Sequence, residues 1–168
     1  MTEWKPSVTV AAVIEAEGRF LLVEEVQDGR HVLNQPAGHL DPGERLIEAC
    51  VREVMEETAH HFVPEALVGV YRYIYTPKDI TFLRFTFSGR TDGVEAGRSL
   101  DKEIVRTHWL THDEIAARVA EHRTPLVMQC IDDHRAGRHF PLAVVERIFH
   151  DRERKVERIF LRGCGASG

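Results

Sequence analysis

Residues 38–60, GHLDPGERLIEACVREVMEETAH, hold a glycine-bounded loop followed by the clearest helical pattern in the chain. The apolar side chains in this stretch recur with the spacing of one helix face: Ile47, Cys50, Val51 and Val54. That i, i+3, i+4, i+7 spacing is typical of an amphipathic helix packed on a core. The stretch therefore predicts a loop over 38–44 and a helix over 45–58.

Three glutamates occupy a different face of this predicted helix. Glu53, Glu56 and Glu57 stand at i, i+3 and i+4, so they share one sector of the helix surface. Like charges at this spacing repel each other unless a positive charge lies among them. Carboxylates without His or Cys favour a hard cation, Mg²⁺, Mn²⁺ or Ca²⁺, over zinc. Two interpretations stay open from these three residues alone, a solvated acidic surface and a divalent-cation site.

The neighbouring residues favour the cation site. Arg52 lies one turn from Glu56, where its guanidinium can orient a carboxylate. Gly38 opens the preceding loop, and a glycine lets the backbone approach a ligand closely. A loop carbonyl can then complete the metal shell.

The spacing that begins at Gly38 resembles the Nudix box. That box reads G, five residues, E, seven residues, R-E-apolar-x-E-E-x-G-apolar, and Gly38, Glu44 and the run REVMEE (52–57) stand at the matching positions. Two residues at the helix exit depart from it, because Ala59 replaces a glycine and His60 replaces an apolar residue. A glycine there caps the helix, so Ala59 is expected to cost about 1 kcal/mol or to shift the helix end by one residue.

Beyond the box, the sequence is similar to the NudJ-type phosphatases of the same family up to about residue 143. The similar stretches are VTVAAVIEAEGRFLLVEE (8–25), LNQPAGHLDPGERLIEA (33–49), TFLRFTF (81–87) and TPLVMQCIDDHRAGRHFPL (124–142). The resemblance implies an α+β Nudix fold: an α/β/α sandwich with a central mixed β-sheet and the Nudix-box loop-helix-loop. It also implies a Mg²⁺-dependent hydrolase, with Mn²⁺ as the other metal. The implied reaction cleaves diphosphate linkages of nucleoside tri- or diphosphates or of thiamine-type pyrophosphates and releases phosphate.

The resemblance assigns roles to individual residues. The implied metal ligands are Glu53, Glu56, Glu57 and the backbone of Gly38, and the catalytic set adds Arg52 to the three glutamates. Glu44 is expected to support the site by orienting Arg52. A further carboxylate often serves this family as an extra ligand or general base, and Glu103 is the candidate, with Asp101 behind it. The alternative is that both are ordinary loop acids.

Candidate substrate-binding residues lie on a predicted strand pair over 65–74 and 81–90. Arg84 is the first candidate, because an arginine between apolar residues of a half-buried strand needs a partner. Arg72 and Tyr73 are candidates for phosphate contact or ring stacking, although strand alternation places them on opposite faces. For Tyr73, the alternative is simple packing within the sheet.

The rest of the chain predicts strands and helices without regular βαβ alternation, which favours an α+β domain over a Rossmann fold or a barrel. The other predicted strands cover 7–14, 19–26, 31–34 and 105–110, with a loop over 89–99. Two more helices are predicted, over 113–121 behind a Thr111 capping box and over 126–136 before Gly137.

Composition limits the class of protein. The 168 residues are 43% hydrophobic and 29% charged, which fits one globular domain, assigned to 1–150. The charged, then Gly/Ser-rich tail over 151–168 is expected to be partly disordered. A net charge of −5 provides no excess positive field for polymeric nucleic acid. The three cysteines have no CxxC spacing, and no signal peptide or membrane-length apolar run is present, so a cytoplasmic protein is expected.

The expected partner is a small phosphate-containing molecule, and the expected assembly is a monomer or a homodimer. Two alternative functions stay open. One is a Nudix hydrolase for nucleotide sugars or dinucleoside polyphosphates. The other is a non-catalytic Nudix-fold module that binds a ligand, which the retained box glutamates disfavour.

Overall fold

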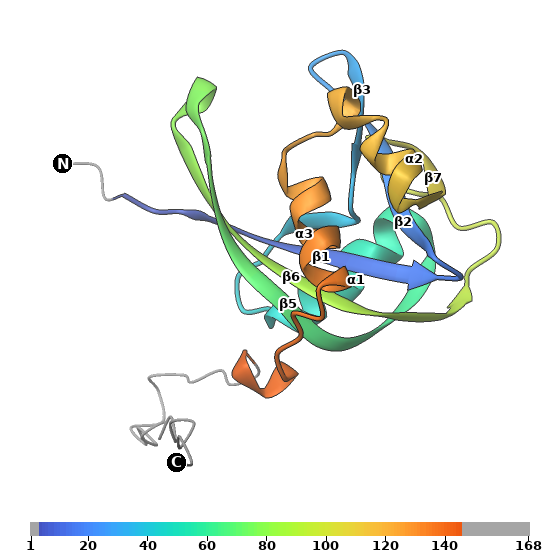
Figure 1. The fold of residues 1–168 in the computed structure, drawn as a ribbon. Helices are drawn as coiled ribbons and strands as arrows, with labels where there is room; N and C mark the ends of the chain where they lie inside the picture. The colour runs from blue at the N-terminus through green and yellow to red at the C-terminus, as the bar shows by residue number, and fades with distance from the viewer. Residues whose placement is uncertain (1–3, 146–168) are drawn as a thin grey trace.

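The computed structural model describes residues 4–145, which fold around a seven-stranded sheet (Figure 1). Its strands are β1 (Ser7–Ala16), β2 (Arg19–Gln27), β3 (Arg30–Asn34), β4 (Ala37–His39), β5 (His60–Tyr75), β6 (Ile80–Val94) and β7 (Ile104–Thr111). The helices are α1 (Leu46–Thr58), α2 (His112–Ala116) and α3 (Leu126–Arg135), with 3₁₀ turns η1 (Thr76–Lys78), η2 (Val119–Glu121) and η3 (Leu142–Val144). The tail predicted over 151–168 lies outside the described residues.

The sheet is mixed, as the sequence predicts. Its strand order is β3-β2-β1-β6-β5, with β4 paired to β1 and β7 paired to β2. β1 runs parallel to β6, and the other pairings are antiparallel. β1 and β2 pair only beside their turn, at Glu15 with Phe20 and Ala16 with Arg19, and then diverge. The sheet therefore opens into two halves away from that turn (Figure 1).

Helices cover both faces of the sheet, which confirms the α/β/α sandwich. On one face, α1 buries Ala49, Cys50 and Val54 against β1, β2 and β6. On the other face, α2 and α3 bury apolar side chains that include Ile115 and Ile131 against β1, β2 and β3. None of the described helices is long and apolar enough to cross a membrane.

Strand β6 is longer than predicted. The segment 89–99 was expected to be a loop, but β6 continues to Val94 and pairs with the start of β5. A Cβ on Gly89 would lie 2.2 Å from the Val63 carbonyl oxygen, so this glycine allows two strands to approach closely. The sequence pattern was wrong here because a glycine inside a strand resembles a glycine in a loop.

Helix α2 is shorter than predicted. A helix over 113–121 was expected, and the Thr111 capping box does form, but α2 ends at Ala116 and a 3₁₀ turn follows. Beyond Ala116, backbone hydrogen bonds join residues three positions apart, as from the Arg118 N–H to the Ile115 carbonyl oxygen at 3.0 Å. The backbone of Arg123 is then tied to the Leu33 carbonyl at 2.9 Å, which draws the chain toward β3 and stops the helix.

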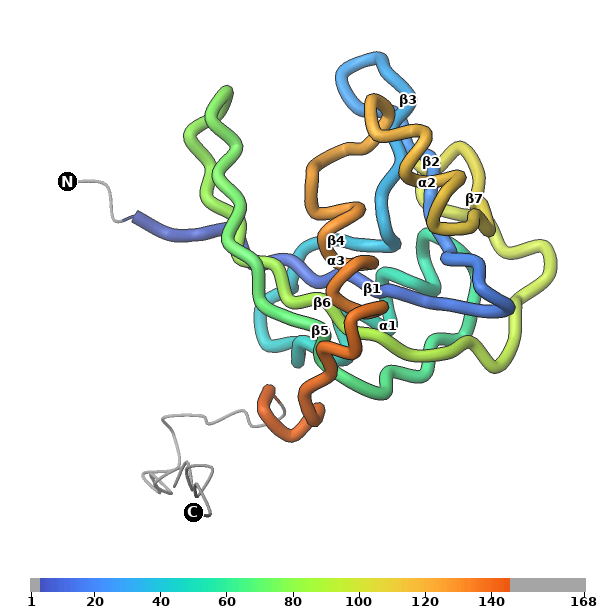
Figure 2. Tube along the Cα trace, viewed as in Figure 1, coloured from blue at the N-terminus to red at the C-terminus, as the bar shows by residue number. Residues whose placement is uncertain are grey.

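The β5–β6 hairpin extends beyond the rest of the sheet. Figure 2 shows its tip, closed by η1, standing away from the helices. Asp79 closes the turn in the left-handed conformation, with φ of 50°. One wall of the pocket described below comes from this hairpin.

Candidate active site

Helix α1 ends where the departures from the box pattern lie. Ala59 takes the left-handed cap conformation, with φ of 59°, and its N–H donates to the Met55 carbonyl at 3.0 Å. The helix end is not shifted, so the cost expected for a non-glycine cap falls on Ala59. His60 fills its apolar position differently: Nδ1 lies 2.8 Å from the Thr58 carbonyl oxygen, and its ring packs edge-on against Trp109. Both departures leave the glutamate face of α1 unchanged.

Arg52 gathers three glutamates around its guanidinium. Nε and Nη2 donate to the two carboxylate oxygens of Glu44 at 2.8 and 2.9 Å. Nη1 donates to Glu53 at 2.7 Å and to Glu56 at 3.0 Å. This positive charge holds the pKa of Glu44 below its usual value. Arg52 therefore fixes the orientation of Glu53 and Glu56, and Glu44 fixes Arg52.

Strand β4 lies directly over the glutamate face. A Cβ on Gly38 would lie 2.1 Å from the Glu53 carboxyl carbon, so only glycine fits beside that side chain. The Ala37 N–H donates to Glu57 Oε2 at 2.8 Å. The loop backbone and the helix carboxylates therefore meet at one place, as the spacing in the sequence implies.

Burial disfavours the charged form of the carboxylates beneath β4. Burial raises the pKa of Glu57 to about 8, with further contributions from the charges of Glu25, Glu53 and Asp101, although the Ala37 N–H opposes the shift. Burial also raises the pKa of Glu53, despite its contact with Arg52. Ionised carboxylates are destabilised in such a place unless a cation joins them. The electrostatics therefore favour a positively charged ligand.

The structure ranks the two loop acids differently from the sequence. Asp101 is tied to the end of α1 through its N–H, which donates to the Glu56 carbonyl at 3.1 Å, and its charge acts on Glu53 and Glu57. Both side chains are exposed, and the Glu103 carbonyl accepts from the Val26 N–H at 3.1 Å. Asp101 is therefore better placed than Glu103 to act as the further carboxylate.

Glu25 joins the same region, and the sequence interpretation missed it. It lies on β2 with 6% of its surface exposed, and its charge contributes to the raised pKa of Glu57. Arg123 Nη1 donates to its Oε2 at 2.7 Å, while Oε1 is buried without a hydrogen-bond partner. The one signal in the sequence was an acidic pair, Glu24-Glu25, at the end of an otherwise apolar strand.

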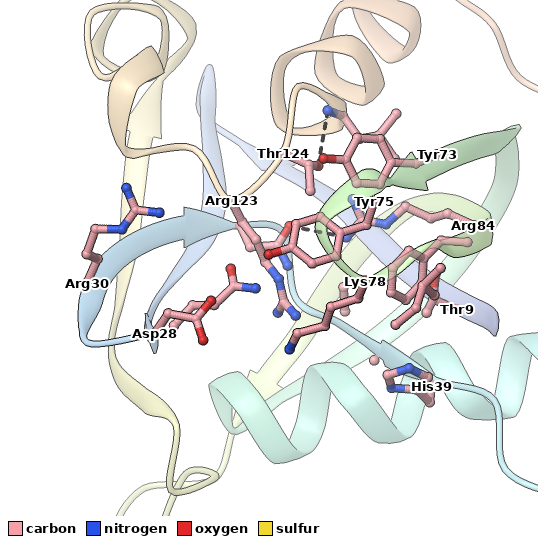
Figure 3. A pocket seen from close by; sticks show the side chains of 17 residues that line it. Thr9, Asp28, Arg30, His39, Tyr73, Tyr75, Lys78, Arg84, Arg123 and Thr124 are labelled. Atoms are coloured by element: carbon pink, nitrogen blue, oxygen red, sulfur yellow. Dashed lines mark hydrogen bonds between the residues drawn. The ribbon is translucent and has the colours of Figure 1, made fainter.

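A pocket of about 310 Å³ opens beside Gly38, between the two halves of the sheet (Figure 3). Its walls come from the β2–β3 turn, β4, the β5–β6 hairpin and the start of α3. The charged side chains that line it are mostly basic: Arg30, Lys78, Arg84 and Arg123, against Asp28. Such a lining suits an anionic ligand.

The predicted substrate residues fall on different sides of β5 and β6. Arg84 lines the pocket with 6% exposure, and its Nη2 donates to Asn34 Oδ1 at 3.2 Å. A buried guanidinium has several donors to satisfy, so its place in the pocket suits contact with an anionic or polar group. Tyr73 and Tyr75 also line it (Figure 3). Arg72 is exposed on the opposite face of β5 and does not line this pocket.

A hard divalent cation fits the donor set under β4. The carboxylates there offer only oxygen donors, as Mg²⁺ and Mn²⁺ prefer. Among residues 4–145, however, no three His, Cys, Asp or Glu side chains already form a metal-binding geometry. Glu53 and Glu56 instead contact the Arg52 guanidinium.

Comparison with known proteins agrees with this geometry. The sequence model of the NUDIX domain matches residues 4–130. The chain belongs to the Nudix hydrolase family. It is 37% identical to phosphatase NudJ of Escherichia coli K12 over 142 residues, which cover 84% of this chain and 92% of that protein. The Nudix resemblance found in the sequence, its closeness to NudJ and its hydrolase class are thereby confirmed.

Solved structures of Nudix proteins support the fold. A NUDIX hydrolase from Nitrosomonas europaea superposes with a TM-score of 0.84 at 53% identity, covering 86% of this chain and 98% of that one. The NUDIX domain of Shewanella oneidensis NrtR, solved with ADP ribose, gives a TM-score of 0.64 at 15% identity, covering 80% and 90%. The second likeness shows the fold alone.

Proposed function

We propose that this Nudix hydrolase is Mg²⁺-dependent and cleaves the diphosphate linkage of nucleoside tri- or diphosphates or of thiamine-type pyrophosphates, releasing phosphate. The observation that carries the proposal is the meeting of strand β4 with Glu53 and Glu57, two carboxylates of raised pKa, beside a basic pocket. A cation there would remove the repulsion among the carboxylates. A diphosphate bound to that cation would place the rest of the substrate in the pocket.

The chain's own residues divide the work of binding and positioning. The residues proposed to hold the cation are Glu53, Glu56, Glu57 and the Gly38 carbonyl. The cation would neutralise charge on the diphosphate oxygens and lower the pKa of a bound water. Arg52 keeps Glu53 and Glu56 in reach of the site. Asp101 is the proposed further carboxylate, either as an extra ligand or as the general base that takes the proton of the attacking water.

The pocket supports a substrate with one organic group. Its volume of about 310 Å³ lies at the lower end of the range for small-molecule sites. Tyr73 and Tyr75 offer ring faces, and Arg84 offers hydrogen-bond donors to a heterocycle or a phosphate. This size favours a single nucleoside or a thiamine-type group over a dinucleoside polyphosphate.

Phosphate release, measured with and without Mg²⁺, tests the proposal. The compounds are nucleoside triphosphates, nucleoside diphosphates, thiamine diphosphate, ADP-ribose and a dinucleoside polyphosphate. We expect Mg²⁺-dependent turnover that falls at least about a hundredfold in Glu57→Gln. Glu65→Gln is the matched control, because that glutamate is exposed and pairs only with Arg90 on the surface.

The ranking of compounds separates the candidate functions. Preference for nucleoside or thiamine diphosphates supports the proposal, and preference for ADP-ribose or the dinucleoside polyphosphate replaces its substrate class. If no compound is turned over while a nucleotide still binds in saturating Mg²⁺, the protein is a binding module and the catalytic proposal is wrong.

A further inference from the structure

The starting point is the divided environment of the Glu25 carboxylate. Oε2 accepts a hydrogen bond from Arg123 Nη1 at 2.7 Å, whereas Oε1 is buried and has no hydrogen-bond partner. An ionised oxygen buried without a donor or a cation is strongly unfavourable. The Arg123 contact therefore satisfies only one of the two oxygens of Glu25.

The backbone beside Glu25 is tied to the end of α1 that carries the proposed cation site. Val26, the next residue on β2, donates its N–H to the Glu103 carbonyl at 3.1 Å, and Asp101 of the same loop donates its N–H to the Glu56 carbonyl at 3.1 Å. Glu25 therefore lies where β2 adjoins the loop that leads to the glutamate face of α1, and its charge contributes to the electrostatics there.

No described residue donates a hydrogen bond to the free oxygen. The carboxylates of Glu53 and Glu57 offer only acceptors when ionised, and two carboxylates side by side repel each other. A divalent cation, with its coordinated waters, supplies both a positive charge and hydrogen-bond donors.

We propose that Glu25 is a fourth glutamate of the cation site, contributing its free Oε1 to the shell of the divalent cation that Glu53, Glu56 and Glu57 hold. The inference rests on the proposed Mg²⁺ dependence and extends it to a residue outside the Nudix box. It gives the two oxygens of Glu25 separate tasks. Oε2 secures Arg123, which lines the pocket, and Oε1 serves the metal.

The competing explanation is that Glu25 serves only to anchor Arg123. In that case, removing Glu25 and removing Arg123 affect the protein in the same way, through the shape of the pocket. Direct metal binding separates the two explanations, because only a residue of the cation site changes the affinity for the metal alone. The probe is Mn²⁺ without substrate, titrated into metal-free protein and followed by electron paramagnetic resonance.

The variants include a matched control on the same strand. Glu25→Gln removes the charge, and Glu24→Gln removes the neighbouring charge, which is equally buried but contacts His31 and His108. Arg123→Met removes the anchor while keeping Glu25. The double variant Glu25→Gln with Arg123→Met removes both partners, so no uncompensated buried charge threatens the fold. Thermal unfolding of each metal-free variant establishes that it is folded.

We expect Glu25→Gln and the double variant to weaken Mn²⁺ binding by about tenfold or more. Glu24→Gln and Arg123→Met should stay within about twofold of the natural protein, although Arg123→Met should raise the KM for substrate. Unchanged Mn²⁺ affinity in Glu25→Gln, or an equal loss in Arg123→Met, would overturn the assignment. Glu57→Gln in the same titration separates the two failures: if it weakens Mn²⁺ binding while Glu25→Gln does not, the proposed function stands. If the natural protein binds no Mn²⁺, both proposals fail.

Discussion

Two buried glutamates, Glu24 on β2 and Glu57 on α1, have similar exposure, 6% and 8%, and opposite electrostatics. Around Glu24, His31 Nδ1 lies at 2.6 Å, His108 Nε2 at 2.7 Å and Arg106 Nε at 3.0 Å. These partners hold the pKa of Glu24 at about 2. Glu57 accepts one backbone N–H and faces other carboxylates, and burial raises its pKa to about 8.

Burial alone therefore does not determine whether the pKa of a carboxyl group is raised or lowered. Glu24 is surrounded by donors, so its charge is a structural element of the β2–β3–β7 region. Under β4, Arg52 contacts Glu53 and Glu56, whereas Glu57 has no ion pair with any of residues 4–145. Glu24 has its charged partners within the chain. Glu57 has none among the described residues, so its carboxylate is suited to bind an external cation.

The largest effect is expected where the carboxylate site itself is blocked. In Gly38→Ala, the new methyl group would overlap the Glu53 carboxyl group, so Glu53 must leave its place. We expect turnover to fall about a hundredfold and Mn²⁺ affinity to fall with it, while the fold loses about 1–3 kcal/mol. Gly93→Ala is the control, since its nearest neighbour, His61, would lie at 3.3 Å. Full activity in Gly38→Ala would contradict the placement of Glu53.

Glu57→Gln should show how much the unpaired Glu57 carboxylate lowers the unfolding free energy of the metal-free protein. A raised pKa means that the protonated form of Glu57 stabilises the metal-free protein below about pH 4.5, and that this stability is lost as the pH rises through about 8. Without metal, the variant should therefore exceed the natural protein in unfolding free energy by on the order of 2 kcal/mol at pH 8.5. Denaturant unfolding measures the difference, and added Mg²⁺ should stabilise only the natural protein. A variant less stable at pH 8.5 would refute this interpretation.

Glu24→Gln should behave in the opposite way. A lowered pKa means that ionised Glu24 stabilises the fold above about pH 4.5, and that this stability is lost as the pH falls through about 2. The variant should lose about 1–2 kcal/mol at pH 7, and the deficit should shrink between pH 4.5 and 3. Turnover per folded molecule should stay unchanged. Glu15→Gln, which breaks an exposed contact with His134, is the control and should cost less than about 0.5 kcal/mol.

The smallest effect is expected at Ala59, which belongs to neither cluster. Ala59→Gly relieves the left-handed backbone but removes a buried methyl group, so a net gain of about 0.5 kcal/mol is expected. Thermal unfolding measures it, and the metal affinity should not change. A marked loss of stability would mean that the methyl group matters more than the backbone conformation.

The sequence predicted the parts of the site that depend on local spacing. The box residues meet because helix periodicity and a short loop fix their positions. Periodicity also predicted α1, and the Thr111 capping box predicted the start of α2. Pairings between distant segments were not predictable in this way. Glu24 and Glu25 are adjacent in the chain, yet one meets His108 on β7 and the other meets Arg123 beyond α2. Strand alternation predicts that they lie on opposite faces of β2, but it does not predict which residues they contact there.

The residues that line the pocket were also only partly predictable from the sequence. Alternation correctly separated Arg72 from Tyr73, but the sequence could not say which of the two faces lines a pocket. The pocket forms because β1 and β2 diverge after two residue pairs, and because the β2–β3 turn and the β5–β6 hairpin then face each other across Gly38. Such an arrangement depends on the register of several strands together.

The outer part of the long β5–β6 hairpin holds residues that line the pocket at a distance along the strands from the part that packs on α1. Its outer part carries Tyr73, Tyr75 and Lys78, which line the pocket, while its inner part carries Phe87, packed beneath α1. Because the outer strands pair mainly with each other, adding two residues to each, which keeps every side chain on its face, would lengthen that wall by about 7 Å without moving the carboxylates. Grafts confined to residues 73–82 are thus a route to new substrates on an unchanged hydrolytic centre.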